Sequence, residues 1–282
     1  MACLDRLPRP LIPTALVAVL LSAGAARAAD PSVAPLFSPE PIASAGWIVT
    51  LKVNAVAGPR FPGSDELGAI AYPSVSFRRV GEPRRFSTPD DGISFGLYET
   101  PAFRAGIVGR YVGGRYFETD RRLFGLDDVK WAVEPGLFVE AWPVSFLRAR
   151  AELRRGINGH DGFVADLGLD LVQRFGAFTA SIGPRLALGD GRFTRAYFGV
   201  TPGEAFLNGQ VTPYRPSGGI TSAGVAAALT YDWSERWSTT VHATYRRLTG
   251  DAADSPIVRR FGSENQVTLG ASASYSFVTA GW

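Results

Sequence analysis

The sequence predicts an all-β protein, a transmembrane antiparallel up-and-down β-barrel. Between Phe146 and Arg154, leucine and alanine occupy one alternate set of positions, and charged residues of both signs occupy the other. Phe163–Phe175 repeats this pattern, and similar segments recur along most of the chain. An apolar face toward lipid and a polar face toward a lumen is the period-two pattern typical of outer-membrane barrels.

The N-terminus predicts export from the cytoplasm. Arg6 and Arg9 precede an apolar run, Leu11–Leu21, and small residues follow at Ala26 and Ala28, so residues 1–28 fit a cleaved signal peptide. A membrane anchor is the weaker alternative, because the run is shorter than the roughly 20 residues that a spanning helix needs. Residues 29–45 contain four prolines and predict an extended periplasmic lead, with the barrel over residues 46–282.

From the composition, we expect no nucleic-acid partner. The whole chain has a formal net charge of +3, but residues 1–28 carry three arginines and one aspartate. The remaining chain is therefore nearly neutral, a balance that does not predict a nucleic-acid partner. The single cysteine, Cys3, lies in the expected signal peptide, so the mature chain has no thiol chemistry.

The strands follow from period-two alternation, and glycine, proline and aspartate mark the turns between them. Trp47–Ala57 alternates clearly, whereas Arg84–Thr88 and Ile93–Tyr98 form a weak pair around the turn sequence Asp90-Asp91-Gly92. The expected strands are Trp47–Ala57, Ile70–Arg78, Arg84–Thr88, Ile93–Tyr98, Phe103–Val112, Lys130–Trp142, Val144–Arg155, Phe163–Phe175, Ala177–Leu188, Ile220–Tyr231, Trp237–Leu248 and Asn265–Phe277.

The connectors set the number of strands. Outer-membrane barrels have short periplasmic turns and longer external loops. Short and long connectors alternate in register only if the weak pair counts as two strands, which gives 12 strands with both termini periplasmic; ten strands is the fallback. Aromatic residues near the expected strand ends fit interfacial girdles, and Phe277 or Trp282 serves as the C-terminal assembly signal.

Several loop motifs, taken in order, resemble the MltA-interacting protein family, also called MipA/OmpV. The matching segments are Phe61-Pro62-Gly63-Ser64, Tyr72-Pro73, Gly125-Leu126-Asp127-Asp128, Tyr197-Phe198-Gly199-Val200, Tyr214 through Gly218-Gly219, Arg247–Ala252 and Asp254–Val258. The resemblance spans Trp47 to Phe277 and implies an outer-membrane protein of the Gram-negative cell envelope. It further implies a scaffolding role with a lytic transglycosylase and a murein synthase, or a role in osmotic response and host contact.

Catalysis has little support in the sequence. His160, beside Asp161, is half of an Asp–His pair or, as the favoured interpretation, a solvated loop histidine. His242 falls in the inward phase of its strand, where a hydrogen-bonded lumen histidine is favoured over a catalytic one. No cysteine and histidine cluster has metal-ligand spacing, and no phosphate loop is present. We therefore expect no enzyme activity, cofactor or metal.

The inward phase predicts a charged lumen. Ten basic residues face inward, against five acids, and this excess predicts a bias toward anions if water passes. The alternative is an interior filled by arginine–carboxylate pairs. The inward bases are Lys52, Arg104, Arg110, Lys130, Arg148, Arg150, Arg154, Arg174, Arg185 and Arg246, and the inward acids are Glu134, Glu140, Glu152, Asp166 and Asp170.

The sequence thus favours a non-enzymatic outer-membrane barrel, surrounded by lipid, that binds periplasmic murein hydrolases and synthases through its lead and its short turns. Two alternatives stay open. One is a small anion-biased channel or solute-uptake barrel. The other is a surface adhesin acting through the long segments Gly189–Gly219 and Thr249–Glu264.

Overall fold

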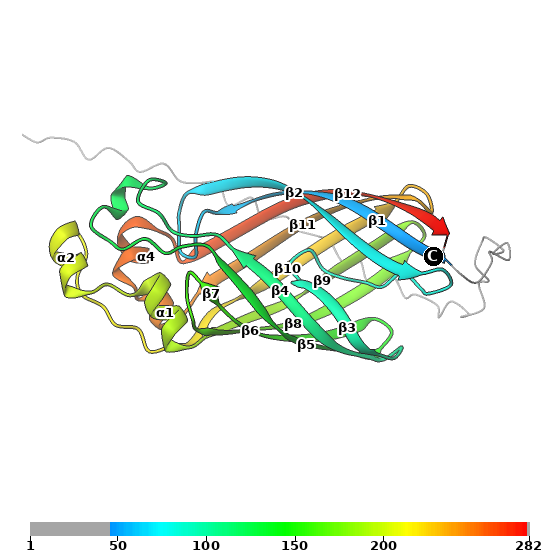
Figure 1. Cartoon of the computed structure of the whole chain (residues 1–282), viewed down its shortest axis with the longest axis horizontal. Helices are drawn as coiled ribbons and strands as arrows, with labels where there is room; N and C mark the ends of the chain where they lie inside the picture. Colours follow the sequence, from blue (N-terminus) through cyan, green and yellow to red (C-terminus); the bar gives the residue numbers. More distant parts are fainter. Residues whose placement is uncertain (1–45, 281–282) are drawn as a thin grey trace, which may run out of the picture. The chain divides into compact units, whose positions relative to one another are not determined.

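A computed structural model describes residues 46–280 (Figure 1). The expected signal peptide and the lead lie outside the described residues. Long antiparallel strands dominate the fold, and Phe103–Val112, Phe163–Phe175 and Trp237–Leu248 have the predicted bounds. The strands are β1 Gly46–Pro59, β2 Leu67–Arg79, β3 Ile93–Glu99, β4 Phe103–Val112, β5 Ala132–Val144, β6 Leu147–Arg155, β7 Ile157–Asn158, β8 Phe163–Phe175, β9 Phe178–Gly189, β10 Gly219–Asp232, β11 Trp237–Leu248 and β12 Asn265–Ala280.

These strands form one curled sheet in which neighbours in the sequence are neighbours in space. The order is β2-β1-β12-β11-β10-β9-β8-β6-β5-β4-β3, and the short β7 extends β6 along β5. The first and last strands of the chain pair over most of their length, from Gly46 with Ala280 to Ala57 with Leu269. The predicted antiparallel up-and-down barrel is confirmed. Within the described residues, no helix is long and apolar enough to cross a membrane.

The predicted strand Arg84–Thr88 is wrong. The sheet does contain twelve strands, but this number includes the two-residue strand β7. Residues 83–88 have no strand pairing. The physical reason is that neither face of this segment suits lipid. One alternate set of positions contains Arg84 and Asp90, and the other contains Arg85 and Asp91. Either phase would place charges in hydrocarbon, which costs several kcal/mol.

The segment Pro83–Gly92, here called the inward segment, instead crosses the interior of the sheet. Phe86 packs edge-on against Trp142 with ring centroids 5.9 Å apart. Arg84 donates a hydrogen bond of 2.7 Å to the Ser238 hydroxyl on β11. Gly92 donates its backbone N–H to Glu152 on β6 at 3.1 Å. The inward segment therefore contacts opposite sides of the curled sheet.

The inward segment leaves an opening in the wall. Every strand pairing is antiparallel, so β2 and β3, at the two ends of the path, run in the same direction. Between them, the chain returns through the interior. Among residues 46–280, no strand pairs with the free edge of β2 or with that of β3.

The outer face of the wall is apolar over most of its surface. Val241 on β11 is 55% exposed and lies opposite Leu229 and Ala271 on the neighbouring strands. The next residue, Thr240, points the other way, where its hydroxyl is hydrogen-bonded to that of Thr230 at 2.8 Å. Apolar residues at Val241 and similar positions form the lipid-facing belt that the alternation predicted.

This pair of neighbours supplies a test of the inside–outside phase. Arginine at Val241 is expected to lower the free energy of unfolding by about 2–4 kcal/mol, because it places a charge near the middle of the bilayer. Thr240 has nearly the same shape as Val241. Arginine at Thr240 is expected to lower the free energy of unfolding by less, because this position faces a polar interior. Urea unfolding in lipid vesicles measures both values, and equal losses at the two positions would contradict the assigned phase.

The long loops fold into a compact cap at one end of the sheet, where Figure 1 places α1, α2 and α4. One cluster of buried side chains includes Tyr197 and Phe198, at 0% and 1% exposure, and a second includes Phe61 and Ile257. The helical elements of this cap are η1 Arg121–Leu123, α1 Gly191–Phe198, α2 Pro202–Asn208, α3 Gly250–Ala253 and α4 Pro256–Phe261.

Candidate functional site in the lumen

The inward charges gather into one connected network of ion pairs. Its members are arginines and carboxylates from β4, β5, β6, β8, β9 and β11, together with two aspartates of the inward segment. Its buried and half-buried members are Arg104, Arg110, Arg148, Arg150, Arg154, Arg185, Arg246, Asp90, Asp91, Glu134, Glu140, Glu152, Asp166 and Asp170. At its edge, Arg104 also pairs with the exposed Glu99, which pairs in turn with Arg85.

Arg148 is a hub of this network. Its guanidinium lies 2.6 Å from Asp91, 2.9 Å from Glu140 and 2.9 Å from Asp170, and the side chain is 1% exposed. The three carboxylates come from the inward segment, β5 and β8. Because a guanidinium has five N–H donors in a planar fork, it can satisfy several carboxylates at once. Arg148 thereby ties three separate parts of the chain together.

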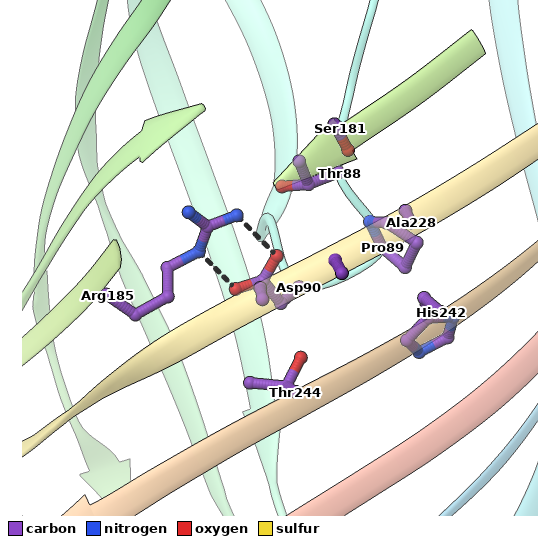
Figure 2. Close-up of a pocket in the computed structure, with 10 residues that line it drawn as sticks. Thr88, Pro89, Asp90, Ser181, Arg185, Ala228, His242 and Thr244 are labelled. Carbon is purple, nitrogen blue, oxygen red and sulfur yellow. Dashed lines mark hydrogen bonds and ion pairs between the residues drawn. The ribbon is translucent and has the colours of Figure 1, made fainter. Parts of the chain in front are cut away.

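The inward segment is held by a second arginine. Arg185 on β9 lies 2.7 Å from Asp90 through its Nε and 2.7 Å from Asp170 through an Nη atom. Figure 2 shows Arg185 and Asp90 facing each other, with Thr88 and Pro89 of the same segment beside Ser181 and His242. Arg246 on β11 also reaches Asp90, at 3.6 Å. The segment is thus anchored by charges from two strands besides Arg148.

At the cap end, the network meets the loops. Arg154 contacts Glu152, Glu134 at 3.0 Å and Asp166 at 2.5 Å. The other oxygen of Glu134 lies 3.0 Å from Nε2 of His160. His160 is 6% exposed and packs edge-on against the rings of Phe193 and Tyr197. The expectation of a solvated His160 is wrong, because its loop folds inward between Glu134 and α1.

The network has no excess charge. Its buried and half-buried members are seven arginines and seven carboxylates, and the exposed pair Arg85–Glu99 adds one of each, whereas the sequence predicted five more inward bases than inward acids. Asp90 and Asp91 supply two of the missing acids. Three predicted bases, Lys52, Lys130 and Arg174, make no ion pair within residues 46–280. The predicted charge excess is therefore not a property of the network itself.

The network has the chemistry of a packed interior. Glu140 and Glu152 are 2% and 4% exposed, and each accepts from more than one arginine. Buried charges need such pairing, because an isolated one would be costly in a low-dielectric interior. Sequence reasoning placed the strand members here but missed Asp90 and Asp91, which it assigned to a tight turn. The signal that could have found them is the four charged residues within the ten-residue inward segment, which indicate a position away from lipid.

The two histidines occupy different surroundings. His242 lies in the inward phase of β11 beside Pro89 and Thr244 (Figure 2), as the alternation predicted. Asp161, the sequence neighbour of His160, pairs instead with Arg192 at 3.1 Å on the surface. The Asp–His pair considered from the sequence is therefore not formed.

In the cap, burial raises the pKa of Tyr197 above its ordinary value, so its hydroxyl stays neutral.

A curled antiparallel sheet with an apolar outer belt and a charged, ion-paired interior defines an outer-membrane β-barrel protein of the Gram-negative cell envelope. Residues 52–277 match the family described as MltA-interacting protein MipA. The chain belongs to this family, as its loop motifs indicated, and it lies in the outer membrane.

Other comparisons give only distant similarity. An outer membrane channel from Pseudomonas putida F1 is 8% identical, with 86% of this chain and 100% of that chain covered and a TM-score of 0.41. The CymD monoaromatic hydrocarbon channel is 10% identical, with 83% and 89% covered and a TM-score of 0.37. The outer membrane protease OmpT from Escherichia coli is 11% identical, with 83% and 98% covered and a TM-score of 0.31. Among curated proteins, none matches the chain.

The motifs that carried the family resemblance lie mainly in the cap. The Ser255 hydroxyl donates a hydrogen bond to the backbone oxygen of Phe198 at 2.7 Å. The Tyr214 hydroxyl donates one to the backbone oxygen of Asp251 at 3.0 Å. Gly63 has a φ of 94° and lies against Val258, a conformation that favours glycine. These contacts give the motifs a structural role in joining three loops, those between β1 and β2, β9 and β10, and β11 and β12.

Proposed function

We propose that this barrel is a non-enzymatic scaffold of the outer membrane that binds periplasmic murein-remodelling proteins, namely a lytic transglycosylase and a murein synthase. Membership in the MipA family over residues 52–277 carries the proposal, because that family is described as interacting with MltA. The ion-paired interior adds support, since buried pairs and the inward segment occupy space that an aqueous channel would need.

The end of the barrel opposite the cap is the surface available to such partners. Its connectors are short, and both described ends of the chain, Gly46 and Ala280, lie there. Trp233, in the turn between β10 and β11, is 67% exposed and stands beside Glu235 and Arg236, which are also exposed. Tryptophan is enriched in protein–protein interfaces and among their binding hot spots. In the sequence, the lead, residues 29–45, comes directly before β1.

The lead and this turn are expected to bind the partner. Deleting residues 29–44 should leave barrel assembly intact and reduce capture of a purified lytic transglycosylase by the barrel in nanodiscs. Proline-rich extended segments lose little entropy on docking, which suits them to recognition. Replacing Trp233 by alanine should also weaken capture, by about tenfold or more if it is a binding hot spot.

Phe206 supplies the control for this experiment. It is 86% exposed on α2 in the cap, at the other end of the barrel. Alanine at Phe206 should leave capture unchanged. If the deletion and Trp233→Ala both fold, as judged by heat-dependent gel mobility, and still capture the transglycosylase and the synthase at wild-type yield, the scaffold proposal is wrong.

A further inference from the structure

The opening between β2 and β3 is the feature that the scaffold proposal does not use. Free strand edges are costly in hydrocarbon, because their backbone N–H and C=O groups lack partners there. Pro73 lies in the middle of β2, and proline has no N–H to donate to a further strand. On the other side, the pairing of β3 with β4 shifts register between Gly96 and Tyr98. Neither edge is thus a regular partner for the other.

The inner face of β2 next to this opening is uncovered. Lys52 on β1 lies opposite Ser274 and Ser74, and Ser274 shares a hydrogen bond with Ser238, which the inward segment contacts. This register places the alternate residues of β2, including Ile70 and Tyr72, toward the interior. Ile70 is 61% exposed and Tyr72 is 40% exposed. The inward segment and the charged network lie against other strands and do not cover them.

The rim on the β3 side is apolar as well. Ile93, Phe95 and Leu97 are 82%, 66% and 68% exposed. An apolar surface therefore runs from the interior at Ile70 and Tyr72 across the opening to the lipid-facing side. Lumen water can hydrate the free backbone groups of the edges, so water and hydrocarbon meet along the opening. Molecules with one polar and one apolar end are most stable at such a boundary.

The positively charged side chain of Lys52 lies beside this surface. Lys52 is half-buried in the inward phase of β1, and among residues 46–280 no carboxylate pairs with it. It lies opposite Ser74, two residues from Tyr72 on the same face. The carboxylates of the main network are already shared among seven arginines, so Lys52 remains available to an anion.

We infer that the opening between β2 and β3 is a lateral binding site for a long-chain fatty-acid carboxylate. The carboxylate pairs with Lys52, and the acyl chain lies over Ile70 and Tyr72 and leaves between β2 and the apolar rim of β3. Charge complementarity with Lys52 selects an anionic head group, and the exposed apolar side chains beside it select an acyl chain. This site is independent of the scaffold proposal, because it faces the bilayer and not the periplasm.

Photocrosslinking in phosphatidylcholine nanodiscs tests this site. The probe is palmitate with a diazirine near its carboxyl end, and peptides are mapped by mass spectrometry. We expect labelling to concentrate on Val49–Asn54 and Ile70–Arg78. The replacement Lys52→Gln should reduce labelling of Ile70–Arg78 about tenfold, which is the loss expected for one charge-assisted hydrogen bond. The diazirine methyl ester of palmitate, which has no charge, should label these peptides weakly in both proteins.

The chain contains one other lysine, Lys130, which is exposed near the cap and serves as the matched control. Lys130→Gln should label like the wild type. Urea unfolding of both variants verifies the fold, and if Lys52→Gln does not fold, Lys52→Arg should fold and keep the labelling. The inference is overturned if palmitate labels the lipid-facing residues evenly around the barrel. It is also overturned if folded Lys52→Gln keeps wild-type labelling.

Discussion

Replacing Arg148 by alanine is expected to lower the free energy of unfolding by about 3–5 kcal/mol, the cost of removing one partner from a buried ion pair. Arg148 is 1% exposed and contacts Asp91, Glu140 and Asp170 at 2.6 to 2.9 Å. Without it, carboxylates from three parts of the chain lose a shared counter-charge at positions where the side chains are buried from solvent. Urea unfolding in lipid vesicles measures the loss.

Arg192 supplies the comparison for Arg148. It pairs with Asp161 at 3.1 Å, but its side chain is 56% exposed, and exposed ion pairs contribute about 0–1 kcal/mol. Alanine at Arg192 should therefore cost little. The variant Asp91→Asn should show coupling with Arg148→Ala, because each removes the same contact. Equal losses at Arg148 and Arg192, or additive effects of Asp91→Asn and Arg148→Ala, would contradict the proposed role of the network.

Replacing Phe198 by alanine is expected to cost about 3–5 kcal/mol in the stability of the cap, as for other large aromatic side chains removed from a packed core. Phe198 is 1% exposed and packs with Phe193, Tyr197 and Val258. Its backbone oxygen accepts the Ser255 hydroxyl. Because the cap has its own core, the loss should appear as faster hydrogen exchange in α1 and α4, with the strands still protected.

The exposed Phe206 on α2 is again the matched control. Alanine at Phe206 should change stability by no more than about 0.5 kcal/mol, as at most surface positions. Unchanged exchange in the cap of Phe198→Ala would show that the loops do not depend on this cluster. A loss spread over all strands would show that cap and barrel unfold as one unit.

Most of the wall could be predicted from the sequence, because lipid and lumen impose opposite chemistry on alternate residues. Three strands have the predicted bounds, and those around Val241 have the predicted phase. The inward segment was missed because its turn-like sequence, Asp90-Asp91-Gly92, suits a hairpin locally. Its charges exclude it from lipid, but local pattern rules do not weigh that cost.

The partners within the site could not be predicted. The sequence indicated which charged residues face inward, but the pairing depends on how the sheet curls. Arg246 on β11 reaches Asp166 on β8 across 80 positions of the chain, at 2.9 Å. His160 was expected in solvent, yet it lies between Glu134 and Phe193. Such contacts join distant segments, and no local periodicity encodes them.

The position of the inward segment is the central claim, and a spin label at Ser87 tests it most directly. Ser87 is exposed within this segment, and residues 29–282 contain no cysteine, so Ser87→Cys can be labelled alone. In vesicles, the label should be more accessible to a water-soluble nickel chelate than to oxygen, which concentrates in lipid. Val241→Cys, on the lipid face, should show the reverse. A label at Ser87 that behaves like the one at Val241 would place the segment in the wall and contradict the structure described above.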